Sequence, residues 1–237
     1  MKAVVLQPTY LPWMGYFGMI DIADVFVFYD DTQFVKQSWQ QRNRIKTSSG
    51  PLWLTVPVVR SFGQKINEVK VNNNTKWSER HWKSIKYDYS KAPFLNDYIQ
   101  VFEEIYSKEW TYLIDLNITI IKEITRILGL KTEFVFSSEL KAEGTKTDRL
   151  INIITEIGAD EYVSGPAAKS YMDVERFARE GISLYWYEFE HPVYPQLYGD
   201  FIAYLSVIDL LFNVGEESLE LIRKGGEHAL KKAETTS

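Results

Sequence analysis

The first thirty residues contain two short apolar runs on either side of one helical segment. Residues 3–6 are continuously apolar and stop at Gln7-Pro8. Residues 25–29 are also continuously apolar and stop at Asp30-Asp31, and residues 15–23 between the runs have helical spacing. Strands without alternation are typical of a parallel sheet that is covered on both faces. The opening segment therefore predicts a strand, helix, strand unit of a parallel sheet.

The same alternation returns in the second half of the chain. It predicts strands at residues 133–136, 161–163 and 182–188, helices at 145–157 and 173–179, and closing helices at 201–213 and 216–224. Strands that alternate with helices are typical of a doubly wound sheet. We therefore predict an α/β fold with a doubly wound, mainly parallel, Rossmann-like sheet.

Two insertions interrupt this pattern. Residues 41–46 and 52–58 flank the turn sequence Thr-Ser-Ser-Gly-Pro and predict a β-hairpin. Residues 76–129 carry helical periodicity in three segments and predict a helical subdomain. We expect an α/β core at residues 1–75 and 130–215 that includes the hairpin at 41–58, a helical insertion at 76–129, and a C-terminal helix with a polar, frayed tail at 216–237.

Composition excludes several classes of protein. The 237 residues include no cysteine, which excludes disulfide scaffolds, thiol nucleophiles, iron–sulfur clusters and cysteine-ligated zinc. There are 27 basic and 32 acidic residues, whereas a surface that binds DNA usually shows a basic excess. The longest apolar stretch, residues 201–212, is shorter than the roughly 20 residues of a membrane span. We expect a cytoplasmic protein that does not bind DNA and does not span a membrane.

Ligands of a doubly wound sheet bind beyond the carboxyl ends of its strands. Three segments follow predicted strands at that edge, namely residues 7–16, 30–44 and 164–171. In the first, Gly15 stands at a helix start after a proline-stiffened loop, where backbone N–H groups can face a phosphate or carboxylate. The alternative is a rigid turn that serves packing only.

The second segment combines acidic and basic side chains. Asp30 and Asp31 follow a strand directly, so they can hold a metal ion such as Mg²⁺, orient a hydroxyl or act as a base. Arg42 and Arg44 point to one face if they lie on a strand, and two guanidinium groups can bind a phosphate or carboxylate. The alternative is that these charges neutralise each other as surface ion pairs.

The third segment contains small residues and one lysine. Ser164 and Gly165 permit close approach of a ligand to the backbone, and Lys169 can supply a positive charge; a structural Ser-Gly-Pro turn is the alternative. His191 follows the last predicted strand and is our preferred general base. Since the chain has only three well-separated histidines and no cysteine, we predict no dedicated metal site.

Aromatic residues make up 15% of the chain, which predicts either a bulky core or a flat platform for a base or sugar. The candidate catalytic residues are Asp30, Arg42 and His191. The candidate substrate-binding residues are Gln7, Tyr10, Trp13, Gly15, Tyr16, Asp31, Gln33, Trp39, Asn43, Arg44, Ser164, Gly165, Lys169, Tyr194 and Gln196.

Five motifs in these segments resemble those of the WbqC-like proteins. They are Gln-Pro-x-Tyr-Leu-Pro-Trp-x-Gly-Tyr-Phe at residues 7–17, Asp-Asp-x-Gln-Phe at 30–34, Asn-Arg-Ile at 43–45, Tyr-x-Ser-Gly-Pro-Ala at 162–167 and Leu-Ser-x-Ile-Asp-Leu-Leu-Phe-Asn-x-Gly at 205–215. The resemblance extends from the first predicted strand to about residue 215. It implies a bacterial protein associated with the biosynthesis of O-antigen and other surface polysaccharides.

The opening unit is also similar in layout to nucleotidyltransferases of the HIGH superfamily. In those enzymes a His-x-Gly-His sequence follows the first strand and steadies a triphosphate. Here Gly15 stands at the glycine, but Trp13 and Tyr16 stand at the histidine positions. Neither side chain carries a cation, which argues against adenylyl transfer by that mechanism and favours a retained pocket with altered chemistry.

Three functions follow, ranked in this order. The first is an enzyme that transfers an acyl or aminoacyl group onto the amine of a nucleotide-linked amino sugar. Its donor would be a thioester, an aminoacyl-tRNA, or an adenylate made in the site from ATP with Mg²⁺. Arg42, Arg44 and Lys169 would bind phosphates or a carboxylate, Asp30 or His191 would deprotonate the amine, and Trp13, Tyr16 or Trp39 would stack on the base or sugar. The second function is a nucleotidyltransferase that makes an activated sugar, and the third is a non-catalytic protein that binds a sugar nucleotide.

Overall fold

The computed structural model describes residues 1–234, with a six-stranded sheet in the order β10-β9-β8-β1-β2-β7. The strands of this sheet are β1 (Lys2–Leu6), β2 (Val25–Phe28), β7 (Glu133–Phe136), β8 (Glu161–Ser164), β9 (Ser183–Tyr187) and β10 (Leu230–Lys232). Every neighbouring pair is parallel except β9 and β10, which are antiparallel. The predicted α/β fold with a mainly parallel sheet is therefore confirmed.

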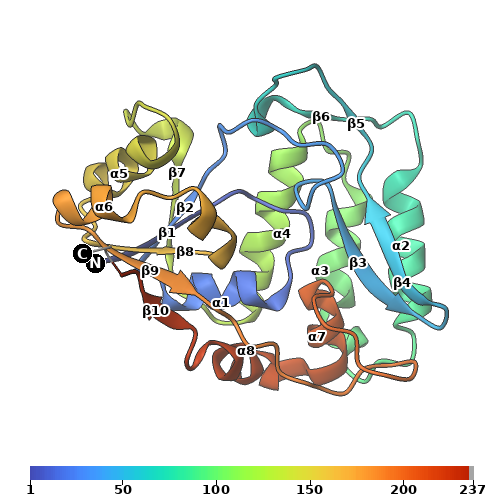
Figure 1. Ribbon diagram of the computed structural model, residues 1–237. Helices are drawn as coiled ribbons and strands as arrows, with labels where there is room; N and C mark the ends of the chain where they lie inside the picture. Colours follow the sequence, from blue (N-terminus) through green and yellow to red (C-terminus); the bar gives the residue numbers. More distant parts are fainter. Residues whose placement is uncertain (235–237) are drawn as a thin grey trace.

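Helices cover both faces of the sheet (Figure 1). On one face lie α1 (Met14–Ile22), α4 (Leu113–Ile127) and α8 (Ser218–Gly226), and on the other lie α5 (Lys146–Glu156) and α6 (Val174–Arg179). Successive side chains of a strand point to opposite faces. In β1, Val4 accordingly packs with the first group, while Ala3 and Val5 pack with the second. Burial on both faces explains why the strand is continuously apolar.

The predicted insertions are present between β2 and β7. The hairpin consists of β3 (Arg42–Thr47) and β4 (Gly50–Thr55), and a second pair is formed by β5 (Val58–Val59) and β6 (Lys70–Val71). The helices are α2 (Trp77–Asp88) and α3 (Leu95–Ser107), followed by α4. Buried side chains of α2, α3 and α4 belong to the same hydrophobic cluster as those of α1, so the insertion and the sheet share one core. Figure 1 shows the hairpin beside α2 and away from the sheet.

Two closing segments differ from the prediction. The helix expected at residues 201–213 begins only at α7 (Val207–Val214), because Ser206 caps it and Tyr204 has a backbone φ of 59°. The part of the expected frayed tail that the structure describes, up to residue 234, contributes β10, in which Leu230 pairs with Tyr187. Residues 235–237 of that tail lie outside the described residues. The polar composition of this tail gave no sign of the pairing, since an edge strand is held mainly by backbone hydrogen bonds.

The hairpin lies close to the loop that follows β1. Asn43 on β3 donates from Nδ2 to the Leu11 carbonyl at 2.6 Å, and the Tyr10 N–H donates to the Trp39 carbonyl at 2.9 Å. The start of α7 joins the same place, because the Val207 N–H donates to the Pro12 carbonyl at 2.8 Å. Three segments far apart in the chain therefore meet beside the carboxyl end of β1.

Candidate binding pocket

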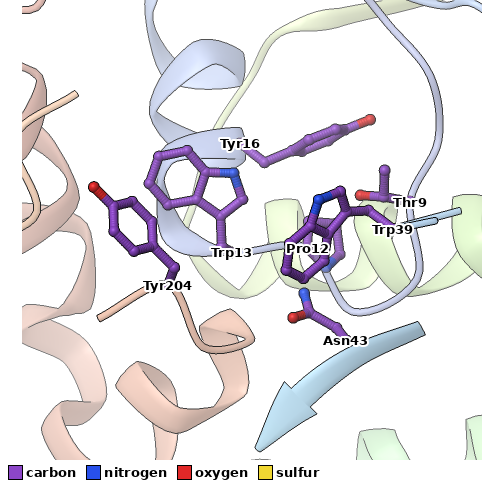
Figure 2. A pocket seen from close by; sticks show the side chains of 7 residues that line it. All are labelled: Thr9, Pro12, Trp13, Tyr16, Trp39, Asn43 and Tyr204. Atoms are coloured by element: carbon purple, nitrogen blue, oxygen red, sulfur yellow. The ribbon is translucent and has the colours of Figure 1, made fainter. Parts of the chain in front are cut away.

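A pocket of about 290 Å³ lies where these three segments meet (Figure 2). Its lining residues are Thr9, Pro12, Trp13, Tyr16, Trp39, Asn43 and Tyr204. Trp13 and Tyr204 lie on one side of it and Trp39 on the other. Most of the wall is thus aromatic, while Thr9 and Asn43 add polar side chains. A mainly apolar concavity with a few polar groups is the usual form of a small-molecule site.

The structure brings together only some of the residues expected at a single site. Trp13, Tyr16, Trp39 and Asn43 line the pocket as a group. Sequence reasoning missed Thr9, Pro12 and Tyr204. Thr9 and Pro12 lie inside the first candidate segment and could have been found there, whereas Tyr204 lies in a segment that we expected to be helical.

Gly15 is explained by the packing of Trp13. A Cβ atom at residue 15 would lie only 2.2 Å from the nearest atom of the Trp13 indole. The indole therefore covers the start of α1, where we expected backbone N–H groups to face an anion. The structure supports the alternative that this glycine serves packing, and the packing it permits forms one wall of the pocket.

Tyr10 lies in the core and does not reach the pocket. Its side chain is fully buried, and its hydroxyl is hydrogen bonded to His81 Nδ1 at 2.9 Å and to the Tyr106 hydroxyl. Burial raises the pKa of the Tyr10 phenol well above its ordinary value. The side chain therefore anchors the loop after β1 to α2 and α3, and only its backbone lies beside the pocket.

His81 makes the stability of the protein depend on pH. Burial lowers the pKa of this imidazole from 6.5 to about 4. Below the unfolded-state pKa of about 6.5 the unfolded chain gains a proton that the folded chain does not, so stability is lost as the pH falls towards 4. We expect the free energy of unfolding to be about 2 kcal/mol lower at about pH 5 than at about pH 7.5 from this group alone.

Urea denaturation at the two pH values measures this effect, with His81→Gln as the control. Glutamine can still accept the hydrogen bond from Tyr10, and it does not titrate. The pH-dependent loss in the unchanged protein should exceed that in the variant by about 2 kcal/mol. Equal losses in both proteins would show that His81 is not the group responsible.

Asp30 and Asp31 form a separate polar cluster with side chains beyond β7. Asp30 is buried. Its Oδ1 accepts from the Ser137 hydroxyl and from the Ser138 N–H, both at 2.9 Å. Its Oδ2 accepts from the Ser138 hydroxyl at 2.5 Å. Asp31 forms an ion pair with Arg149. Burial alone would raise the pKa of Asp31, but the Ser137 hydrogen bond and Arg149 lower it overall. Neither aspartate lines the pocket, and the serines that satisfy Asp30 carried no sequence signal.

Gln7 connects the pocket to this aspartate cluster. Its Oε1 accepts from Gln40 Nε2 at 2.8 Å. Its Nε2 donates at 3.0 Å to Oγ1 of Thr32, the residue that follows Asp31. Its carbonyl accepts from the hydroxyl of the pocket residue Tyr16 at 3.2 Å. Gln33, by contrast, is exposed and pairs through its backbone with Lys65.

The segment after β8 contributes no side chain to the pocket. Ser164 is buried and hydrogen bonded to Tyr162. Burial raises the pKa of the Tyr162 phenol, and the hydrogen bond with Ser164 offsets part of that rise. Lys169 is ion-paired with Glu188. The hydrogen bond from Lys169 lowers the pKa of the Glu188 carboxyl. Gly165 has open space around its Cα, so nothing packs where its side chain would be.

His191 stands directly behind one wall of the pocket. Its ring is stacked on Trp13 at a centroid distance of 6.3 Å and lies edge-on to Tyr204 at 5.3 Å. Nδ1 lies 3.0 Å from the Pro192 carbonyl, which can only accept, so Nδ1 carries the proton and Nε2 is the acceptor in the neutral ring. Burial lowers the pKa of His191 from its ordinary value, so the ring is neutral near pH 7.

Tyr194 and Gln196 belong to a buried network below the hairpin. The Tyr194 hydroxyl and Gln196 Nε2 both donate to Asp209 Oδ2 at 2.8 Å, and the Tyr89 hydroxyl donates to Oδ1 at 2.8 Å. The buried Lys46 donates to Gln196 Oε1 at 3.1 Å. These two predicted ligand-binding residues are therefore engaged in holding the loop before α7 against β3.

Arg42 and Arg44 lie on the outer side of the hairpin rather than in the pocket. Their guanidinium carbons lie 4.3 Å and 5.5 Å from the centroid of the Trp53 ring. Arg44 Nη2 also donates to the carbonyl of Tyr204 at 3.4 Å, so this arginine stands at the pocket rim. The shared strand face that we predicted for the two arginines is present.

Two further properties concern the described part of the chain only. Within residues 1–234, no group of three or more His, Cys, Asp or Glu side chains is placed to hold a metal ion. Over the same range, no helix is both long and apolar enough to cross a membrane.

Comparison with known proteins agrees with the motifs found in the sequence. A protein of Mycobacterium tuberculosis that is named as uncharacterized is 39% identical over 226 residues, which cover 94% of this chain and 97% of that protein. No solved structure matches the chain with significance. The model of the WbqC-like protein family matches residues 7–221, which include every residue that lines the pocket. The chain therefore belongs to the WbqC-like protein family.

Proposed function

We propose that this protein is a transferase of bacterial surface-polysaccharide biosynthesis that joins an acyl or aminoacyl group to the amine of a nucleotide-linked amino sugar. The observation that carries the proposal is the aromatic pocket beside the carboxyl end of β1. Family membership supports the pathway, and the geometry of the pocket supports the class of substrate.

The pocket suits a single sugar ring. Its volume of about 290 Å³ is at the lower end of the range for small-molecule sites, which begins at about 300 Å³. The indoles of Trp13 and Trp39 line the pocket from different sides (Figure 2), and flat apolar rings of this kind suit the apolar faces of a pyranose. Asn43 and Thr9 supply polar groups for hydroxyls.

The proposed reaction is attack of the sugar amine on the carbonyl carbon of the donor. A C–N bond forms, and the bond from the carbonyl carbon to the donor's leaving oxygen or sulfur breaks. The amine loses one proton to a base, and the base returns that proton to the leaving group. The acyl group therefore replaces a hydrogen on the amine, and that hydrogen ends on the leaving group. No oxidant or reductant is needed.

His191 is the base that we propose. Its pKa is lowered, so Nε2 can accept a proton near neutral pH. It contacts Trp13 and Tyr204, both of which line the pocket. Asp30 is less suited, because both of its oxygens already accept hydrogen bonds from Ser137 and Ser138. We therefore place the sugar amine at the side of the pocket formed by Trp13 and Tyr204.

The donor that fits these residues is one that is already activated. Asp30 and Asp31 are the adjacent carboxylates that could hold Mg²⁺ for an ATP-dependent step, but their oxygens are engaged by Ser137, Ser138 and Arg149. They do not offer a free ligand set, so we derive no adenylation step. A thioester or an aminoacyl ester would supply the acyl group directly.

Product analysis tests the proposal. The protein is mixed with glucosamine linked to uridine diphosphate and with a panel of acyl thioesters and aminoacyl-tRNAs. Mass spectrometry should find the nucleotide sugar heavier by one acyl group. The N-acetylated nucleotide sugar is the control, because its nitrogen is already blocked, and it should give no product. Binding of the nucleotide sugar without product from any donor would contradict the transferase proposal.

The role of His191 is tested by the variant His191→Asn. We expect kcat to fall by about 100-fold with little change in KM, because a positioned base typically contributes about 10²–10⁴-fold. His228→Asn is the matched control, since that histidine is exposed and lies near the C-terminal end. An increase in KM alone, with kcat unchanged, would show that His191 supports Trp13 and does not transfer the proton.

A second candidate is a non-catalytic protein that binds a sugar nucleotide. It is favoured by one observation: His191 stands behind the pocket wall and does not line it. This candidate predicts the same dependence of binding on Trp13 and Trp39, but no acylated product.

A further inference from the structure

The outer side of the β3–β4 hairpin carries two arginines over one indole. The guanidinium groups of Arg42 and Arg44 lie 4.3 Å and 5.5 Å from the centroid of the Trp53 ring. Trp53 was not among the residues that the sequence pointed to. Trp53 is 42% exposed, so part of the indole is open to solvent.

Neither arginine is neutralised by a carboxylate. Within residues 1–234, Arg42 and Arg44 take part in none of the ion pairs. Arg44 Nε is buried and has no hydrogen-bond partner in the same range. By contrast, Arg149 and Lys169 near the sheet edge are paired with Asp31 and Glu188. Arg42 and Arg44 therefore carry positive charges without a carboxylate partner among residues 1–234, in a chain whose net charge is -5.

This surface is continuous with the pocket. The ring centroids of Trp53 and Trp39 lie 5.5 Å apart, and Trp39 is both 49% exposed and part of the pocket lining. Arg44 reaches the same rim through its hydrogen bond to the Tyr204 carbonyl. A ligand in the pocket can thus extend outward over Trp39 and Trp53 and past the two arginines.

Exposed indoles beside unpaired guanidinium groups suit a ligand with a flat ring and negative charges. Bases stack on aromatic side chains, and arginine binds phosphate oxygens through paired N–H groups. Two arginines match the two phosphates of a nucleoside diphosphate, which is also the group that an activated sugar carries.

We propose that Trp39, Arg42, Arg44 and Trp53 form a subsite for the nucleoside diphosphate part of the ligand. The base stacks on the exposed part of Trp53, the diphosphate contacts Arg42 and Arg44, and the ligand enters the pocket past Trp39. This inference deepens the proposed function and rests on it, because it takes the sugar in the pocket to be nucleotide-linked.

Calorimetry with nucleoside diphosphates that carry no sugar tests the subsite. The probes are the diphosphates of uridine, adenosine, guanosine, cytidine and thymidine, with inorganic pyrophosphate as a probe that has no base. At least one nucleoside diphosphate should bind the unchanged protein. Trp53→Leu should weaken that binding by about ten-fold and leave pyrophosphate binding unchanged, since loss of stacking removes only the contact with the base.

The double variant Arg42→Gln/Arg44→Gln keeps the indole and removes the charges. It should weaken binding of the nucleoside diphosphate by about ten-fold or more and make the remaining affinity less sensitive to salt. Lys86→Ala is the matched control. Lys86 also lies over an indole, 5.3 Å from the Trp82 ring, but it is paired with Glu103, so its loss should leave binding unchanged.

Three results would overturn the subsite. They are failure of every nucleoside diphosphate to bind, unchanged affinity in both the Trp53 and the arginine variants, and pyrophosphate binding as tight as that of the nucleotides. The failure of the proposed function looks different, because it appears as a missing acylated product. Acyl transfer that persists at full affinity for the nucleotide sugar in both variants would reject the subsite and leave the transferase in place.

Discussion

Replacing Asp209 with alanine should lower the free energy of unfolding by about 3–5 kcal/mol, the range for breaking a buried charged network by removing one partner. Asp209 is fully buried and accepts hydrogen bonds from Tyr89, Tyr194 and Gln196. Alanine leaves these three donors without their acceptor. Such a loss is a large part of the stability of a typical domain, about 5–15 kcal/mol.

Chemical denaturation of the variant measures this loss, and Asp115→Ala is the matched control. Asp115 stands in the first turn of α4, as Asp209 stands in the first turn of α7, but its side chain is exposed. The control should change the free energy of unfolding by no more than about 1 kcal/mol. If the two variants were equally stable, the buried network would not be what holds the loop before α7 against the hairpin.

Replacing Gly15 with alanine should weaken binding of a nucleotide sugar by about ten-fold or more. The new methyl group would lie 2.2 Å from the Trp13 indole, so the ring must move away from the start of α1. Because Trp13 forms a wall of the pocket and stacks on His191, its movement changes both the cavity and the contact to the proposed base. Overpacking of this kind typically costs about 1–3 kcal/mol of stability, and binding that requires the indole in its original position must overcome the same cost, which corresponds to about 5–150-fold in affinity.

Gly165→Ala is the control for this substitution. Gly165 also follows a strand of the central sheet, but no atom lies within 4 Å of the position where its Cβ would be. The alanine there should leave both affinity and stability unchanged. Calorimetric titration with glucosamine linked to uridine diphosphate compares the two variants, and equal affinities would show that the position of Trp13 does not matter for binding.

The sheet could be predicted from the sequence because its strands are buried on both faces. Residues 3–6 and 25–28 had to be continuously apolar, and Gln7-Pro8 and Tyr29-Asp30 follow them. Strand β10 could not be predicted in the same way. It lies at the sheet edge and pairs with β9 through backbone atoms, so Lys231 and Lys232 can be exposed and polar.

The pocket could be predicted only in part. Trp13 and Tyr16 lie in the loop and helix after β1, where the rule for doubly wound sheets directs attention. Tyr204 could not be found, because its segment has helical spacing, whereas in the structure Tyr204 has a positive φ and the helix begins only after the Ser206 cap.

The aspartate pair shows a different limit of sequence reasoning. Adjacent carboxylates after a strand suggest chemistry, but whether they are free depends on residues that lie far away in the chain. Ser137 and Ser138, more than 100 positions later, satisfy the oxygens of Asp30. Lys46 could not be recognised as buried for the same reason, since Asp200 and Gln196, about 150 positions later, surround its ammonium group.

The central claim, that the aromatic pocket holds the sugar of an activated amino sugar, is tested most directly by a crystal structure of the complex. Crystals would be grown with glucosamine linked to uridine diphosphate. We predict electron density for the sugar ring between Trp13 and Trp39, with its nitrogen on the side of Tyr204. Density for the sugar against Arg149 and Asp31, or beside Lys169, with the pocket filled only by water, would contradict the account.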